Sequence, residues 1–345
     1  MKRIGNLYEK IISLDNLRLA DEKARRGKLR SYGVLLHDKN REANILALHE
    51  TLKNRTFKNS EYSTFTIYEP KERIIFRLPY YPDRILHHAI MNILEPIWVS
   101  VFTKDTYSCI KGRGIHGAMR NVKRAIKDRE NARYCLKIDI RKFYPSIDHD
   151  VLKAIIRRKI KCKDTLALLD TIIDSTDGVP IGNYLSQYFA NLMLAYFDHW
   201  IKEEKRVRYY FRYADDMVFL ASTKEELHIL LADIKKYLAA LKLTLKGNEQ
   251  IFPIAENRAD KHGRGLDFVG FVFYHNQTLM RKSIKQNFCR MAARLNKKLN
   301  ISARDYKQRL CGWYGWAKVS NSKHLLKTII KSQFYDTFVL RCKAV

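Results

Sequence analysis

Residues 209–220 read Tyr209-Tyr210-Phe211-Arg212-Tyr213-Ala214-Asp215-Asp216-Met217-Val218-Phe219-Leu220. Aromatic and β-branched residues flank two adjacent acids, which predicts a hairpin with the acids at or near its turn. Two neighbouring carboxylates repel each other, so a positive group is expected beside them. Hard divalent cations such as Mg²⁺ bind carboxylate oxygens and keep waters and substrate phosphates as further ligands. The stretch therefore predicts a metal site for phosphoryl chemistry, although a solvated turn explains an isolated Asp-Asp pair equally well.

A third acid, Asp139, ends a second predicted strand, Tyr134-Cys135-Leu136-Lys137-Ile138-Asp139. An acid at the end of a strand can share a cation with acids on an adjacent hairpin. Two-metal catalysis needs such convergence, because one ion activates a hydroxyl while the other stabilises the leaving group. Phosphoryl transfer needs little covalent help from the protein, so positioned acids and cations can carry most of it.

Two other features accompany the acids. Val179-Pro180-Ile181-Gly182-Asn183-Tyr184 forms a turn that opens an apolar helix, where Gly182 would let the backbone approach a base or sugar closely. By itself this turn is also typical of an ordinary helix start.

Basic residues recur in the N-terminal third; each could be merely solvated, but together they suit a triphosphate and a template backbone. They are Lys71, Arg73, Arg77, Arg84, Lys111 and Arg113.

The charge of the chain indicates a polyanionic partner. Its 345 residues include 65 Lys and Arg against 36 Asp and Glu, a formal net charge of +29, and the excess runs along the whole sequence. Such a positive field attracts polyanions, of which nucleic acid is the commonest. The six cysteines form no C-x-x-C pair, which does not fit a zinc finger and indicates free thiols in a reducing compartment. With no signal peptide and no apolar run of membrane-spanning length, we expect a soluble, cytoplasmic protein without a membrane partner.

Strands that carry acids, surrounded by helical patterns, predict an α+β fold. We expect helices over residues 1–60 and then a basic hairpin formed by residues 62–68 and 74–76. Further expected elements are helices at 86–102, 114–128, 150–173, 184–205 and 223–241, short strands at 243–253 and 267–274, and basic helices from about residue 282. In that last segment Trp313, Tyr314 and Trp316 are expected to pack a core rather than to stack on bases.

In order and separation these parts resemble reverse transcriptases. The palm of that family carries a strand Asp, a Gly-containing turn and helix, and Tyr-x-Asp-Asp, as do Asp139, Gly182 and Tyr213-Ala214-Asp215-Asp216 here. Other matching segments are residues 79–84, 107–114 and 266–271, the last resembling a primer grip, so that roughly residues 60–280 are covered. The resemblance implies a right-hand polymerase fold with an N-terminal helical extension (1–60), fingers (61–133 with part of 150–178), palm (134–281) and a short helical thumb (282–345).

The resemblance also implies an RNA-directed DNA polymerase that adds dNMPs to a 3′-OH with two Mg²⁺ ions, for which Mn²⁺ could substitute. The implied metal ligands are Asp139, Asp215, Asp216 and the backbone carbonyl of Ile140. The residues expected to contact the nucleotide are Lys71, Arg73, Tyr144, Ile181, Gly182, Gln187 and Lys246. Those expected to contact template RNA or the RNA–DNA duplex are Arg77, Arg84, Lys111, Arg113, Gly270, Lys282, Lys285 and Arg290. Tyr144 would lie beneath the incoming sugar, and Lys246 is a candidate for protonating pyrophosphate, since Glu249 stands where the family often has a lysine.

Within the family, the turn and helix are most similar to the enzymes of diversity-generating retroelements, which copy a template repeat RNA with errors at adenines. Most bacterial members have Gln-Gly-x-x-x-Ser-Pro there, whereas this chain has Ile181-Gly182-Asn183-Tyr184-Leu185-Ser186-Gln187. Loss of the Gln side chain would weaken control of base-pair geometry, since such contacts decide selectivity by a few kcal/mol. This resemblance implies a small, basic, ring-forming accessory protein as a partner. A phage-defence or orphan bacterial reverse transcriptase and a non-catalytic RNA-binding scaffold remain as alternatives.

Overall fold

The computed structural model describes residues 3–68, 72–298 and 300–332. The chain divides into two compact units. The first comprises Met1–Ile110, Asp139–Arg206 and Ala232–Asn248, and the second comprises Lys111–Ile138, Val207–Leu231 and Glu249–Val345. Helices and strands both contribute, so the α+β prediction is confirmed. In the described part of the chain, no helix is both long enough and apolar enough to cross a membrane.

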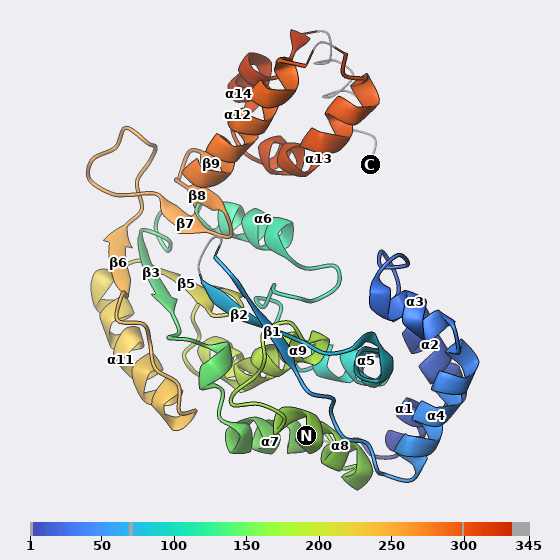
Figure 1. Ribbon diagram of the computed structural model, residues 1–345. Coiled ribbons are helices and arrows are strands. Elements are labelled where there is room, and N and C mark those ends of the chain that lie inside the picture. Colours follow the sequence, from blue (N-terminus) through green and yellow to red (C-terminus); the bar gives the residue numbers. More distant parts are fainter. Residues whose placement is uncertain (1–2, 69–71, 299, 333–345) are drawn as a thin grey trace. The chain divides into compact units, whose positions relative to one another are not determined.

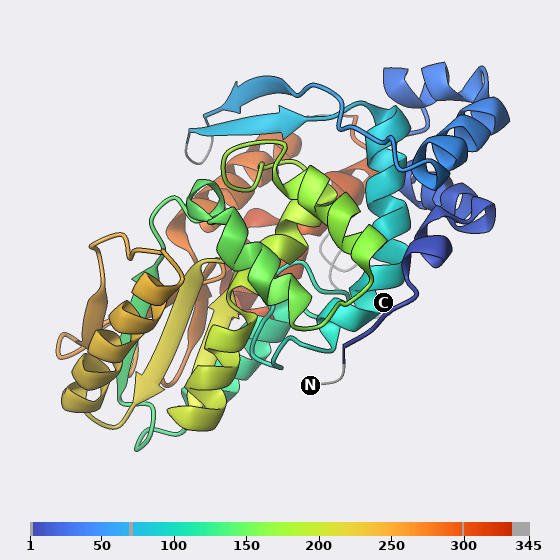
Figure 2. The same cartoon turned by 90° about the horizontal axis from the view of Figure 1, so that it is seen from below.

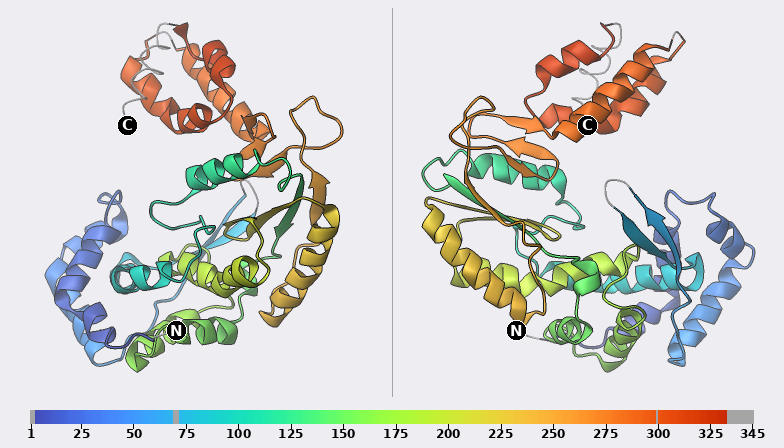
Figure 3. Two further views of the ribbon diagram at one scale, coloured as in Figure 1. Left: turned by 180° about the vertical axis from the view of Figure 1, so that it is seen from behind. Right: turned by 60° about the vertical axis from the view of Figure 1, so that its left-hand side comes forward.

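The N-terminal part of the first unit is helical, as predicted. Its helices are α1 (Tyr8–Ile12), α2 (Leu14–Ala24), α3 (Tyr32–Asp38) and α4 (Arg41–Lys53). They lie beside the long apolar helix α5 (Ile85–Val99), with α2 packed along it (Figure 3). The carboxylate of Asp21 is fully buried and accepts hydrogen bonds from Arg25, Arg41 and the Tyr80 hydroxyl. Because a buried carboxylate is stable only when paired, this cluster joins α2 to α4 and to the segment before α5.

The predicted basic hairpin is present in the first unit (Figure 2). Strands β1 (Ser63–Ile67) and β2 (Arg73–Arg77) pair antiparallel, with Ser63 opposite Arg77 and Ile67 opposite Arg73. The connection at residues 69–71 lies outside the described residues. A short helical turn, η1 (Tyr80–Arg84), then leads into α5. The hairpin therefore carries its basic residues at both ends of β2.

The remaining helices of the first unit surround a buried one. The predicted helix at 150–173 is two helices, α7 (His149–Arg157) and α8 (Lys163–Ile173), and the one at 184–205 is α9 (Tyr184–Met193), α10 (Ala195–His199) and the turn η3 (Trp200–Glu204). A further short turn, η2 (Tyr144–Ser146), precedes α7. Helix α9 is mostly buried and packs against α5 and α7, which agrees with its apolar sequence.

A four-stranded sheet in the second unit has the order β4-β5-β3-β6 (Figure 1). Its strands are β4 (Tyr209–Tyr213), β5 (Asp216–Ala221), β3 (Tyr134–Asp139) and β6 (Gln250–Pro253), and α6 (Ile115–Ala125) packs against β4. Helix α11 (Lys224–Ala240) follows β5, and Thr223 caps its start, since the Thr223 hydroxyl accepts from the Glu226 amide at 3.2 Å. The strand predicted over 243–253 is shorter than expected. Gly247 has a φ of +79°, which breaks the extended backbone and leaves only Gln250–Pro253 as β6.

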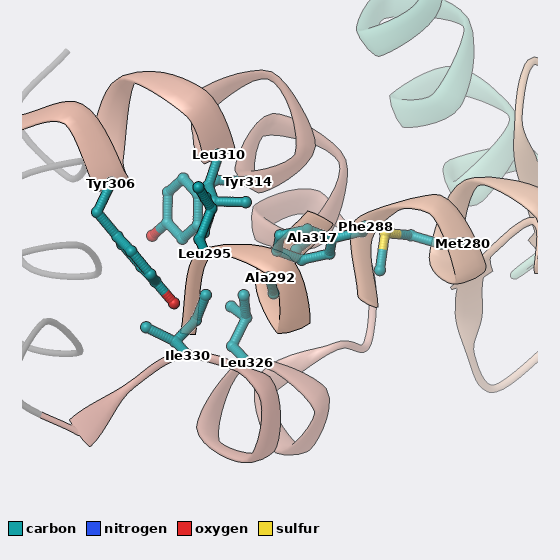
Figure 4. Close-up of a cluster of buried hydrophobic side chains, with 10 residues drawn as sticks. All are labelled: Met280, Phe288, Ala292, Leu295, Tyr306, Leu310, Tyr314, Ala317, Leu326 and Ile330. Carbon is teal, nitrogen blue, oxygen red and sulfur yellow. The ribbon is translucent and has the colours of Figure 1, made fainter. Parts of the chain in front are cut away.

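The C-terminal part of the second unit begins with a small sheet of β7 (Leu266–Phe268), β8 (Phe271–Phe273) and β9 (Thr278–Met280). Helices α12 (Lys282–Asn296), α13 (Ala303–Val319) and α14 (Lys323–Ile329) follow, so the predicted helical segment is confirmed as far as residue 332. Their apolar side chains face one another (Figure 4). Trp313 stacks on Phe288 with ring centroids 6.3 Å apart, and Trp316 lies 4.9 Å from the Phe271 ring. These aromatics pack a core, as predicted.

Candidate active site

The hairpin that carries the adjacent acids has a turn of two residues. Tyr213 pairs with Asp216, which leaves Ala214 and Asp215 as the turn between β4 and β5. Ala214 has a φ of +56°, a left-handed conformation that costs a residue with a β-carbon roughly 1–2 kcal/mol. The buried guanidinium of Arg212 donates to the carbonyl of Ala214 at 3.1 Å and so supports this strained turn. The prediction that the acids lie at the turn of a hairpin is confirmed.

The order of the strands brings the third acid to the same sheet. Strand β5 lies between β4 and β3; Asp216 is the first residue of β5, and Asp139 is the last residue of β3. The ammonium of Lys137 lies 3.5 Å from Asp216 Oδ2, so the C-terminal part of β3 runs beside the first residue of β5. Since side chains two apart share one face of a strand, Lys137 and Asp139 project from the same face of β3.

Lysines balance the negative charge of these acids. Lys137 contacts Asp216, and Lys246 Nζ lies 3.2 Å from Asp139 Oδ2. In residues 3–68, 72–298 and 300–332, no three His, Cys, Asp or Glu side chains are already grouped as a metal centre. The donors nevertheless fit Mg²⁺, because carboxylate oxygens are hard ligands that already attract positive charge in this structure. Ile140, whose carbonyl is a further predicted ligand, pairs in an antiparallel bridge with Leu245.

The predicted turn at Gly182 is tied by its backbone to two other segments of the first unit. The amide of Phe76 in β2 donates to the Ile181 carbonyl at 2.7 Å, and the Val179 amide donates to the Tyr144 carbonyl at 2.9 Å. Gly182 has a φ of +123°, and a β-carbon there would lie 2.2 Å from the Phe76 carbonyl oxygen. Only glycine fits such an approach. The structure therefore brings Tyr144, Ile181 and Gly182 into one neighbourhood beside β2.

Two of the predicted nucleic-acid contacts, Arg77 and Arg84, line a cavity of about 980 Å³ in the first unit, which also reaches Gly182. Lys28, before α3, lines the same cavity. Burial and the charge of Arg77 lower the pKa of Arg84, while burial and the charge of Arg84 lower the pKa of Lys28. In the described part of the chain, neither Lys28 nor Arg84 forms an ion pair with a carboxylate. Cations that lie close enough to repel one another favour an anionic ligand.

Aromatic and imidazole side chains complete this cavity. Tyr32 and His37 of α3 line it, and the His37 ring stacks on Tyr81 with centroids 5.6 Å apart. His87 is buried, and its Nε2 atom has no hydrogen-bond partner among the residues that the structure describes. Burial, then the neighbouring His88 and Arg84, lowers the pKa of His87 to about 3, so this ring is neutral at physiological pH. A cavity with cations, flat rings and a polar atom suits a strand of phosphates and bases.

The other predicted residues lie elsewhere. Lys71 is outside the described residues, Arg73 is exposed at the start of β2, and Gln187 is exposed on α9. Lys111 and Arg113 precede α6 in the second unit. Lys282, Lys285 and Arg290 are exposed on α12. The structure thus does not gather these predicted residues into the cavity that holds Arg77 and Arg84.

Gly270 lies in the turn between β7 and β8, where it has a φ of +84°. A β-carbon there would come within 2.5 Å of the Trp316 ring. Close packing against Trp316 therefore requires glycine at this position, and a contact of Gly270 with nucleic acid stays a prediction.

Sequence reasoning missed three residues at these sites. Lys28 carries no local signal, because only the packing of the N-terminal helices brings it to Arg84. His87 carries none either, since in the sequence it is one position in an apolar helix. Lys137 could have been found, since its separation of two from Asp139 on a strand places both on one face.

Comparison with known proteins adds a family and a fold. Residues 68–248, more than half of the chain, match the family described as reverse transcriptase (RNA-dependent DNA polymerase). Protein YkfC of Escherichia coli (strain K12) is 24% identical over 266 residues, which cover 63% of this chain and 67% of YkfC. Group II intron-encoded protein LtrA of Lactococcus lactis subsp. cremoris is 27% identical over 139 residues, which cover 37% of this chain and 23% of LtrA.

Among solved structures, apo telomerase from Candida tropicalis is similar to this chain with a TM-score of 0.50 and 11% sequence identity. The similarity covers 81% of this chain and 60% of the telomerase chain, so the chain spans less than two thirds of that protein. At this identity the likeness concerns the fold, which is the predicted right-hand polymerase fold. With a family match that contains the buried helix α9, the Gly182 turn and the Asp215–Asp216 hairpin, the chain belongs to the reverse transcriptase family.

Proposed function

We propose that this protein is an RNA-directed DNA polymerase that adds dNMPs to a 3′-OH on an RNA template. The observation that carries the proposal is the sheet order β4-β5-β3, which sets the hairpin of Asp215 and Asp216 beside the strand that ends at Asp139. Asp139, Asp215 and Asp216, with the Ile140 carbonyl, would hold two Mg²⁺ ions, or Mn²⁺ in their place. When bound, such ions activate the 3′-hydroxyl and stabilise the leaving pyrophosphate.

Other residues would bind and orient the substrates. The close approach of the Gly182 backbone to β2 supports a nucleotide site there, with Tyr144 and Ile181 nearby and Gln187 on the following helix. Arg73 and Lys71 would contact the triphosphate, and Lys246, beside Asp139, would give a proton to pyrophosphate. Arg77 and Arg84, which line one cavity, would hold template phosphates. Lys111, Arg113, Gly270 and the basic residues of α12 would contact the duplex.

Primer extension on an RNA template tests this reaction. Asp215→Asn should lower the rate of dNTP incorporation by roughly 100-fold or more, because each group that stabilises developing charge contributes about that factor. Asp15→Asn is the matched control, since the Asp15 side chain is fully exposed on α2 and its loss should leave the rate unchanged. Full incorporation by Asp215→Asn would reject the proposal, and absence of incorporation by the unaltered protein would favour a non-catalytic RNA-binding scaffold.

We further propose that the enzyme belongs to a diversity-generating retroelement and works with a small basic accessory protein. Ile181 and Gln187, in place of the Gln and Pro of most bacterial members, support this narrower assignment. Sequencing of products copied by the purified enzyme should show errors concentrated at template adenines, and Ile181→Gln should reduce them. Equal fidelity at all four bases, unchanged by Ile181→Gln, would indicate a phage-defence or orphan enzyme and leave the polymerase assignment intact.

A further inference from the structure

Lys137 lies in the C-terminal part of β3 and has two partners in the second unit, one on the adjacent strand β5 and one on β7 of the small sheet. Its ammonium donates to the backbone carbonyl of Asp267 in β7 at 2.5 Å and lies 3.5 Å from Asp216 Oδ2. The side chain is about one quarter exposed, and that of Asp216 about one third. The attraction within a partly buried ion pair is screened less by water and salt than that within an ion pair at the surface. Lys137 therefore acts directly on one of the acids proposed to hold metal.

The carbonyl that Lys137 binds is itself held in place. The guanidinium of Arg281, just before α12, donates to both carboxylate oxygens of Asp267, with Nε distances of 2.7 Å and 3.0 Å. The Arg281 amide donates to the Gly270 carbonyl at 2.9 Å, which extends the pairing of β8 with β9 by one residue. The guanidinium of Arg281 therefore holds the Asp267 side chain, and its amide holds Arg281 itself against the same small sheet. Lys137 thus has a fixed, neutral acceptor in the Asp267 carbonyl. This hydrogen bond would keep the ammonium in place when the Asp216 carboxylate binds a metal cation.

We propose that Lys137 is a positioning residue that serves Asp216 as a built-in counter-ion and competes with the divalent cation for it. This inference rests on the proposed function, because it takes Asp216 as a metal ligand. Before a cation binds, the ammonium offsets the repulsion between Asp215 and Asp216 and orients the Asp216 carboxylate. When a cation binds, the ammonium remains nearby on the Asp267 carbonyl, and the two positive charges repel each other. Lys137 therefore weakens cation binding by the free protein while keeping its acids in place.

Binding of Mn²⁺ to the protein without nucleic acid tests this directly, with free Mn²⁺ measured by electron paramagnetic resonance. Lys137→Gln removes the charge and keeps a donor for the Asp267 carbonyl, and Lys137→Met removes both. Both variants should bind Mn²⁺ about tenfold more tightly, since a nearby charge shifts an ionic equilibrium by roughly one to three orders of magnitude. Lys137→Arg keeps the charge and should keep the weaker binding.

A control variant and a thermal measurement separate competition from simple damage to the fold. Lys242→Met removes a lysine that is ion-paired to Asp148 at 2.7 Å instead of to one of these acids, and should leave Mn²⁺ binding unchanged. In a chelator, Lys137→Gln should melt at a lower temperature than the unaltered protein, because Asp216 loses the ammonium beside it. Added Mn²⁺ should raise its melting temperature by more than it raises that of the unaltered protein.

Each outcome bears on the proposal. Equal or weaker Mn²⁺ binding by both Lys137→Gln and Lys137→Met would overturn it, as would a tighter binding that persists when Asp216→Asn is added. If the unaltered protein bound no Mn²⁺ in a manner sensitive to Asp215→Asn, the metal site of the proposed function would fall, and this inference with it.

Discussion

Lys246 is joined to Asp139 by two contacts. Its amide donates to the Asp139 carbonyl at 2.9 Å, and its ammonium lies 3.2 Å from the Asp139 carboxylate. The backbone contact holds the residue against the end of β3, while the side chain remains about two fifths exposed. A lysine held in this way stays beside the acid yet can turn toward a substrate phosphate.

Lys246→Ala should therefore lower the single-turnover rate of incorporation by about 100-fold, the lower end of what a positioned proton donor contributes. Rapid-quench primer extension at saturating dNTP measures this rate. Lys242→Ala, four residues earlier and paired with Asp148, is the matched control and should change it little. An unchanged rate in Lys246→Ala would show that another group protonates pyrophosphate.

Gly182→Ala should destabilise the first unit by about 3 kcal/mol or more, because the new β-carbon meets the Phe76 carbonyl at 2.2 Å and the backbone is left-handed. Gly27 has a φ of +71° and nothing within 4 Å of the place that a β-carbon would take, so Gly27→Ala should cost only about 1 kcal/mol. Urea unfolding of both variants compares the two effects. Equal costs would mean that β2 moves away from the turn without penalty.

Lys28→Ala should weaken binding of single-stranded RNA. It should also make the slope of log binding constant against log salt concentration less steep by about one, because one fewer counterion is released. The reason is that Lys28 shares a cavity with Arg77 and Arg84 and has no carboxylate partner in the described part of the chain. Fluorescence anisotropy over a range of salt concentrations gives the slope. Lys39→Ala, exposed at the end of α3 and outside the cavity, should leave the slope unchanged. Identical slopes for the two variants would mean that the cavity does not contact the RNA.

Stability should fall as the pH drops below about 6.5, in part because of His87. Its pKa is lowered to about 3 in the folded protein, so the unfolded chain takes up the proton first, and stability is lost as pH falls from about 6.5 toward 3. Between pH 7 and pH 5 this group alone should cost about 2 kcal/mol. His87→Leu should make stability depend less on pH. Some pH dependence should remain because of His88, since burial and the charge of Arg84 lower the pKa of His88 to about 4.

Urea unfolding at pH 7, 6 and 5 measures the effect of His87. The comparison variant is His228→Asn, on the exposed face of α11, which should follow the unaltered protein. A slope in His87→Leu as steep as in the unaltered protein would place the pH dependence in other groups.

Local patterns predicted most of the elements, because alternation and helical periodicity act over a few residues. The hairpin around Asp215 and Asp216, the basic hairpin of β1 and β2, and the helix after Gly182 all lie where the pattern indicated. One boundary that differs involves a backbone conformation set by a single residue. Gly247, with its positive φ, shortens the strand predicted over 243–253.

The sequence by itself determined the acids, their place on strands and turns, and the family, because these depend on residue type and spacing. The tertiary structure decided which charges meet. Lys137 reaches Asp216 because β3 and β5 are neighbours in the sheet, and Lys28 reaches the neighbourhood of Arg84 because the N-terminal helices pack along α5. Such pairs join residues far apart in the chain, and their energies depend on distance and burial, which no local pattern of residues contains.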